Sequence, residues 1–249
     1  MTLAESVRVG REFAKLSVRE LAALSGVAPS TVLRIEEGFE NPRADVVERL
    51  LPNIGMAVTY TSEQQPAAIR AARAILGNSA RIALDAKAAE WAEHWKAARW
   101  TKDGEALKPE KIARQAGSLN WLDERPQARA FLPTKSWREL AASLIEADVP
   151  FAMTGGPAAN CLVPVGQNME PRFYVEDVET AVGFAGLQPL PEGYFGPRIV
   201  LLPFDGIVER EPYRLEEDGL VLANIWQIAI DCYGTTSTKQ ADALLGLWE

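Results

Sequence analysis

Apolar residues recur at helical spacing in two short stretches between residues 11 and 37, and Gly26 lies between the stretches. Two short helices with this spacing can share one small core, and glycine suits the sharp turn that joins them. The pattern therefore predicts a helix-turn-helix. Its expected core positions are Leu16, Leu21, Ala22, Val27, Val32 and Ile35.

The sequence also predicts where these two helices begin. Ser17 and Glu20 have the spacing of a capping box, in which the two residues satisfy each other's backbone N–H groups at a helix start. Pro29 fits the first turn of the second helix, residues 28–37, because a backbone N–H is not needed there. We expect Pro29, Ser30, Thr31 and Arg34 to point away from the core.

On these residues, positions 6–51 resemble the xenobiotic-response (XRE)/Cro-repressor family of DNA-binding domains. Arg11 and Glu36 occupy the two positions where many members have an ion pair that joins the first helix to the recognition helix. The resemblance implies a double-stranded DNA operator as partner, with the N-terminal half of the recognition helix against base edges in the major groove. The residues that it places near DNA are Ser17, Ala28, Pro29, Ser30, Thr31, Leu33, Arg34 and Arg43.

Two departures from the family pattern affect the expected contacts, one of which should be missing and the other weakened. Val18 stands where members often have Gln, and Ala28 replaces a common Ser. A helical hairpin that serves only packing or dimerisation would explain the same apolar positions. DNA binding also explains why the exposed face of the second helix is polar and nearly free of carboxylates before Glu36.

The rest of the chain predicts an α+β fold with a second domain at 66–249. A short polar linker follows the first domain, residues 1–60. Two helices are expected over 66–100 and mostly helical structure over 108–149, with a possible sub-boundary near residue 135. Strands are expected from Pro150 onward. They are placed at the start of 150–165, at 172–175, at 198–204 and at the start of 220–233, and a final helix is placed at 238–248.

The second domain resembles, more weakly, the C-terminal region of antitoxins from abortive-infection (type IV) toxin–antitoxin systems. The similarity rests on the run Met153 to Ala159, on the strands that follow, and on the pattern from Val221 to Leu245. It implies a nucleotidyltransferase-like α/β body, a repressor of its own operon, and a cognate toxin as a possible partner. The usual head of those antitoxins is a winged helix, whereas this head is of the Cro type.

An enzymatic alternative starts from Gly155 and Gly156 at a strand-to-helix turn, followed by Glu176 and Asp177 on a later strand. Nucleotidyltransferases use such glycines for close approach to a triphosphate, and two carboxylates on one strand face to hold metal ions. Adjacent residues on a strand point to opposite faces, so Glu176 and Asp177 fail this requirement. We therefore expect no catalytic residues, no cofactor and no metal site.

Two further hypotheses concern ligands and packing. The body could bind a small molecule in a pocket lined by Arg172, Tyr174 and Arg198, although no ligand motif is present. Trp91, Trp95 and Trp100 lie near basic residues and suit either a nucleic-acid surface or internal packing. Because one such head reads only a few base pairs, we also expect a homodimer.

Charge is distributed unevenly along the chain, whose net charge is −8. Residues 66–139 carry 14 basic and 9 acidic side chains, whereas residues 140–249 carry 5 basic and 16 acidic ones. Because phosphate neutralisation supplies most non-specific DNA affinity, the middle segment is the better placed to assist the head. Two cysteines, one histidine, and no apolar run of about 20 residues or signal segment indicate a cytoplasmic protein with no membrane partner and no disulfide framework.

Overall fold

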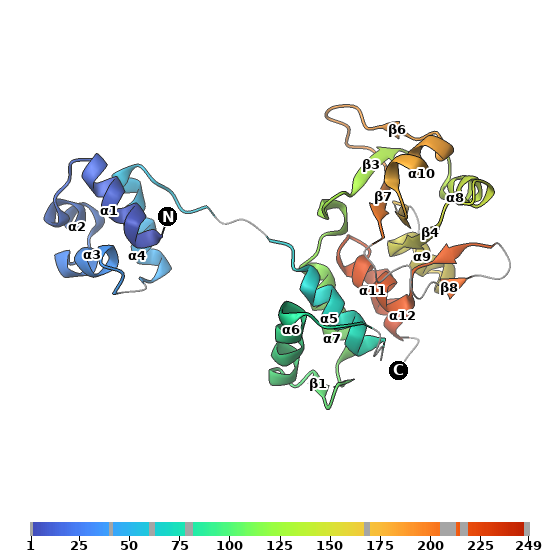
Figure 1. Cartoon of the computed structure of the whole chain (residues 1–249), viewed down its shortest axis with the longest axis horizontal. Coiled ribbons are helices and arrows are strands. Elements are labelled where there is room, and N and C mark those ends of the chain that lie inside the picture. The colour runs from blue at the N-terminus through green and yellow to red at the C-terminus, as the bar shows by residue number, and fades with distance from the viewer. Residues whose placement is uncertain are drawn as a thin grey trace. The chain divides into compact units, whose positions relative to one another are not determined.

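The computed structural model describes residues 2–39, 42–59, 63–77, 82–166, 170–204, 213–214 and 219–246. It divides into two compact units, Met1–Ser62 and Glu63–Glu249, which we treat separately (Figure 1). The expected linker residues 60–62, and the end of the expected final helix at 247 and 248, lie outside the described residues.

The described part of the first unit contains only helices and the loops that join them. Its two central helices are joined at Gly26, whose φ of 64° is left-handed and therefore suits glycine. Leu21, Ala22, Val32 and Ile35 are buried as the sequence pattern predicts, whereas Leu16 and Val27 pack at the edge of this core. The elements are α1 (Leu3–Phe13), α2 (Val18–Ser25), α3 (Pro29–Glu36), α4 (Ala44–Leu50) and the 3₁₀ helix η1 (Leu51–Ile54).

The second unit begins with helices and a small hairpin. The two helices expected over 66–100 are α5 (Pro66–Leu76) and α6 (Ala86–Ala97), and α7 (Pro109–Ser118) follows the hairpin of β1 (Thr101–Lys102) and β2 (Glu105–Ala106). Trp95 is buried, and its indole N–H donates to Gln115 Oε1 at 2.7 Å. Trp95 therefore serves internal packing, and Trp91 and Trp100 pack against the same core.

A mixed seven-stranded sheet forms the centre of this unit, in the order β6-β3-β7-β5-β4-β9-β8. Strand β5 lies between β4, to which it is antiparallel, and β7, to which it is parallel. The strands are β3 (Arg129–Leu132), β4 (Phe151–Thr154), β5 (Arg172–Val175), β6 (Gln188–Pro189), β7 (Ile199–Pro203), β8 (Tyr213–Arg214) and β9 (Val221–Leu222).

Helices pack around the sheet in two groups. Helix α8 contacts α10, whereas α9 contacts α11 and α12, and α11 also packs closely against α7 (Figure 1). The helical segment and the sheet thus share one core, and the expected sub-boundary near residue 135 falls between β3 and α8. These helices are the 3₁₀ turn η2 (Leu122–Glu124), α8 (Trp137–Glu146), α9 (Gly155–Leu162), α10 (Val178–Ala185), α11 (Ile225–Tyr233) and α12 (Thr238–Leu245).

One local prediction is wrong, and one strand was not foreseen. The stretch 108–149 is mostly helical as expected, in α7, η2 and α8, but it also contains β3, which pairs with both β6 and β7. Four residues carry too little periodicity to identify a strand, and long-range pairing decides the conformation. The wrong prediction places Glu176 and Asp177 on a strand. Strand β5 ends at Val175, and Asp177 is the N-cap of α10.

Candidate DNA-binding site

Local hydrogen bonds fix both ends of α2. Ser17 Oγ accepts from the backbone N–H of Glu20 at 3.2 Å, and Glu20 Oε2 accepts from the backbone N–H of Ser17 at 2.7 Å. The capping box expected from the sequence is therefore complete at the start of α2. Across the turn, the N–H of Val27 donates to Ala22 O at 3.0 Å, so the approach to α3 is also held.

A bidentate ion pair joins α1 to α3. Arg11 Nε lies 2.7 Å from Glu36 Oε1, and Arg11 Nη2 lies 2.9 Å from Glu36 Oε2. The two side chains are only 14% and 6% exposed. Hydrogen bonds to Glu36 raise the pKa of Arg11 above its ordinary value. Arg11 Nη1 also donates to Leu16 O at 3.0 Å, so one guanidinium joins α3 both to α1 and to the loop between α1 and α2.

The start of α3 presents a small surface of short side chains. Ala28 is its N-cap and supplies no side-chain hydrogen bond, Pro29 occupies the first turn, and no acidic residue lies in that turn. The exposed start of a helix carries partial positive charge on its backbone N–H groups, which favours an anionic partner such as phosphate. Ala28, Pro29, Ser30, Leu33 and Arg34 are exposed and Thr31 is half-buried.

Two predicted contact residues lie outside α3 and its N-cap. Ser17 is exposed, but its hydroxyl oxygen already caps α2. Arg43 has an 88% exposed side chain, and its Nε lies 3.3 Å from Asp45 Oδ1. A phosphate contact by Arg43 would compete with this exposed ion pair, which is worth little in water.

Sequence reasoning missed Arg49 on α4. Its Nη2 pairs with Asp45 at 3.3 Å, and its Nη1 lies 3.5 Å from Gly26 O. This exposed cation therefore lies against the turn that precedes α3. Its place in the helical pattern of α4 gave no sign of contact with a residue 23 positions earlier in the chain.

Removing Glu36 should destabilise the first unit. In Glu36→Ala, the guanidinium of Arg11 loses both carboxylate oxygens while it stays largely buried, and loss of one partner from such a pair costs roughly 3 kcal/mol. We expect the thermal unfolding of the first unit, followed by circular dichroism, to shift to lower temperature. Glu12→Ala is the matched control, because the Glu12 carboxylate is 61% exposed and lies 3.8 Å from Arg11. Equal melting of the two variants would contradict a stabilising role for the pair.

The second unit holds the three residues of the hypothesised ligand pocket in two different cavities. Tyr174 lines a cavity of about 600 Å³, whereas Arg172 and Arg198 line another of about 460 Å³. Arg172 forms a bidentate pair with Asp123 at 2.7 and 2.8 Å, and Arg198 reaches the same carboxylate at 3.2 Å. The predicted grouping of all three residues is therefore wrong.

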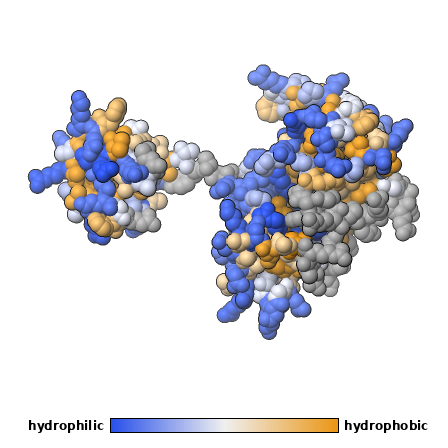
Figure 2. Space-filling view, in the orientation of Figure 1, coloured by the Kyte–Doolittle hydropathy of each residue, from blue (hydrophilic) through white to orange (hydrophobic). Residues whose placement is uncertain are grey.

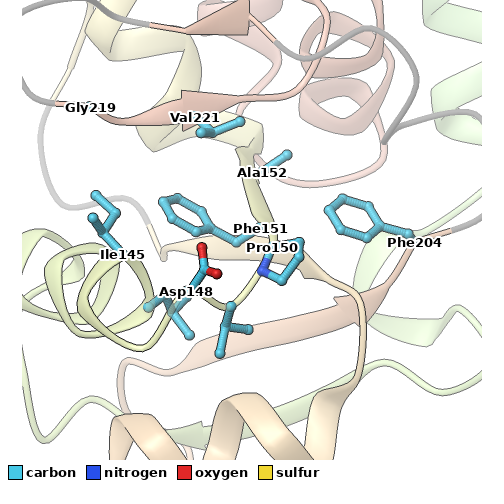
Figure 3. Close-up of a pocket in the computed structure, with 10 residues that line it drawn as sticks. Ile145, Asp148, Pro150, Phe151, Ala152, Phe204, Gly219 and Val221 are labelled. Atoms are coloured by element: carbon cyan, nitrogen blue, oxygen red, sulfur yellow. The ribbon is translucent and has the colours of Figure 1, made fainter.

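A third cavity, of about 320 Å³, lies where β4 begins (Figure 3). Phe151, Phe204 and Val221 form much of its wall, and the carboxylate of Asp148 lies beside Pro150. An apolar wall with one acidic group offers no recognisable set of catalytic or metal-binding side chains.

The glycine turn of the enzymatic alternative lies beside the side chain of Arg172. Gly155 begins α9 with a φ of 68°, and a Cβ added to it would lie 3.6 Å from Arg172 Cδ. Thr154, the residue before it, pairs in register with Arg172 across the sheet. Asp177 accepts a hydrogen bond from the backbone N–H of Thr180 at 2.7 Å, and hydrogen bonding to Thr180 lowers its pKa. The carboxylate of Asp177 is therefore used to cap α10.

Among the described residues, no cluster of three or more His, Cys, Asp or Glu side chains could hold a metal ion. In the same part of the chain, every helix is too short or too polar to cross a membrane.

The comparison with known families matches residues 2–55 to a family described as a helix-turn-helix domain. No curated protein and no solved structure matches the chain. The first unit is thus a helix-turn-helix domain, the kind of domain found in DNA-binding regulators, and it contains every residue of the candidate site.

Proposed function

We propose that this protein is a sequence-specific DNA-binding transcriptional regulator, with α3 as its recognition helix. The observation that carries the proposal is the start of α3: short, exposed side chains with no carboxylate, on a helix fixed by the Arg11–Glu36 pair. In this mode Ser30 and Thr31 hydrogen-bond bases or phosphates, Leu33 contacts a thymine methyl, and Arg34 reaches guanine or the backbone.

Within this function we favour an XRE/Cro-type repressor of its own operon, active in the cytoplasm as a homodimer. Two heads one helical turn apart would multiply the affinity that one small head can supply. Large apolar side chains outside the start of α3 support a contact between copies, and hydrophobic patches are visible on this unit in Figure 2. The exposed ones on α1, on α2 and after the end of α3 are Leu3, Val9, Phe13, Leu24 and Phe39.

For the second unit we propose a nucleotidyltransferase-like scaffold without catalytic activity, acting as the body of an antitoxin toward a cognate toxin. The side chain of Arg172 passes beside Gly155, and its guanidinium is paired with Asp123 and Glu170, so these two carboxylates are already engaged by a cation. Asp177 is committed to its helix cap. A neighbouring gene for a nucleotidyltransferase-like protein would support the antitoxin assignment.

The test of the DNA-binding proposal is operator selection followed by one substitution. Full-length protein is used to select duplexes from a random pool, and affinity is then measured for the selected and a scrambled duplex. Arg34→Ala should weaken binding to the selected duplex by roughly 10-fold to 100-fold if Arg34 reads a base. Arg129→Ala removes one exposed cation from the second unit and is the matched control.

The two duplexes separate the possible roles of Arg34. An equal loss on both would make it a phosphate contact, and no loss on either would remove it from the site. Failure of the full-length protein to prefer any duplex over the scrambled one would overturn the proposed function.

A further inference from the structure

The cavity of about 600 Å³ lies within the second unit, between its first residues and one end of the sheet. Gln64, Pro66 and Ile69 line one side, and Tyr174, Leu202 and Phe204 line the other. Its volume is in the range that small-molecule sites occupy. The segment 63–66 begins the second unit, so the first residues of this unit form part of the cavity wall.

The guanidinium of Arg125 on the cavity wall is fixed by hydrogen bonds to buried side chains. Arg125 Nη2 lies 2.7 Å from Asp231 Oδ1, and Arg125 Nη1 donates to the hydroxyl of Tyr174. Asp231 is fully buried and also accepts from Thr154 Oγ1 at 2.6 Å and from Gln227 Nε2 at 2.9 Å. The carboxylate of Asp231 is shared among several donors, and this network positions Arg125, whose side chain also lines the cavity.

A second guanidinium lines the same cavity from α5. Arg70 Nη2 lies 2.7 Å from Asp85 Oδ2, whereas its Nε is buried and has no hydrogen-bond partner among the described residues. Because this Nε is inaccessible, an anion in the cavity would meet the guanidinium of Arg70 through its terminal N–H groups.

The remaining wall is apolar and aromatic. The rings of Tyr174 and Phe204 stack with centroids 6.4 Å apart and an interplanar angle of 9°. Glu63 and Glu124 also line the cavity, but both are exposed, so water screens their charge more strongly than that of Arg125, whose side chain is 12% exposed. The enclosed part of the cavity thus combines two guanidinium groups, each of which also pairs with an aspartate, with an aromatic surface.

We propose that this cavity binds a small organic anion with a planar ring, a class that includes nucleoside monophosphates and aromatic carboxylates. The anionic group pairs with Arg70 and Arg125, and the ring lies against the wall formed by Tyr174 and Phe204. This site goes beyond DNA binding and concerns the second unit alone. Its test uses protein without DNA, so it can fail while the proposed regulator function stands.

The test is calorimetric titration of the full-length protein with adenosine monophosphate and, separately, with salicylate. Adenosine and inorganic phosphate are the matched ligands, because each supplies only the ring or only the charge. We expect at least one of the two anions to bind with a dissociation constant below about 1 mM, and both control ligands to bind at least about tenfold more weakly. The two anions distinguish a nucleotide site from a carboxylate site.

Two variants test whether the anion binds in this cavity. Arg70→Gln keeps a polar side chain at this half-buried position of α5 and should lower the affinity for the anion by roughly tenfold. Arg129→Gln, which removes an exposed cation that does not line the cavity, should leave the affinity unchanged. The proposal is overturned if neither anion binds below 1 mM, if adenosine binds as tightly as its monophosphate, or if the two variants weaken binding equally. Circular dichroism of both variants checks that they remain folded.

Discussion

Asp231→Ala should unfold the second unit at markedly lower denaturant concentration than the unchanged protein. The carboxylate is fully buried and accepts from Arg125, Thr154, Tyr174 and Gln227. Its removal leaves the guanidinium of Arg125 in a largely buried place without its counter-charge. Breaking one side of a buried ion pair costs roughly 3–5 kcal/mol, and the loss of the shared acceptor acts in the same direction.

The measurement is urea unfolding of the full-length chain, followed by tryptophan fluorescence. All seven tryptophans lie in the second unit, so this signal reports that unit without contribution from the DNA-binding head. Glu179→Ala is the matched control, because it also removes a carboxylate that pairs with an arginine, Arg129, but both side chains are more than half exposed. We expect this control to change the free energy of unfolding by less than about 1 kcal/mol. Similar values for the two variants would show that the buried network contributes no more than a surface pair.

The first unit was predictable from sequence because its determinants are local. The capping box, the glycine turn and the apolar spacing each lie within a few residues, and the Arg11–Glu36 pair follows from a resemblance that covers the whole domain. Whether the eight predicted residues touch DNA stays a prediction. Their exposure and their position around α3 were foreseeable, whereas the contact of Arg49 with the turn required the packing of α4.

The second unit was less predictable because its important contacts are long-range. Arg125, Thr154, Tyr174 and Asp231 lie on four separate segments, and no spacing rule connects them. Strand β3 was missed for the same reason, since its pairing with β7 joins residues about 70 positions apart. Adjacent carboxylates at Glu176 and Asp177 drew attention as a possible metal site, yet the strand ends before them and one of them caps a helix.

A second large effect is expected from a single methyl group at Gly117. This residue lies in α7 where that helix crosses α11, and a Cβ there would lie 2.2 Å from Ile230 O and 2.6 Å from Tyr233 Cβ. Because one obstacle is backbone, the two helices must move apart in Gly117→Ala. Overpacking of this kind costs roughly 1–3 kcal/mol or more, and exceeds the helix-propensity gain of up to about 1 kcal/mol that alanine brings.

Gly183→Ala supplies a control in which the propensity gain acts alone. Gly183 is an exposed position in α10, and no described atom lies within 4 Å of an added Cβ. We expect this variant to stabilise the second unit by roughly 0.5–1 kcal/mol, while Gly117→Ala lowers the urea midpoint. Opposite signs for two identical substitutions would identify the close approach of α7 to α11 as the cause, whereas stabilisation by both would mean that these helices do not meet at Gly117.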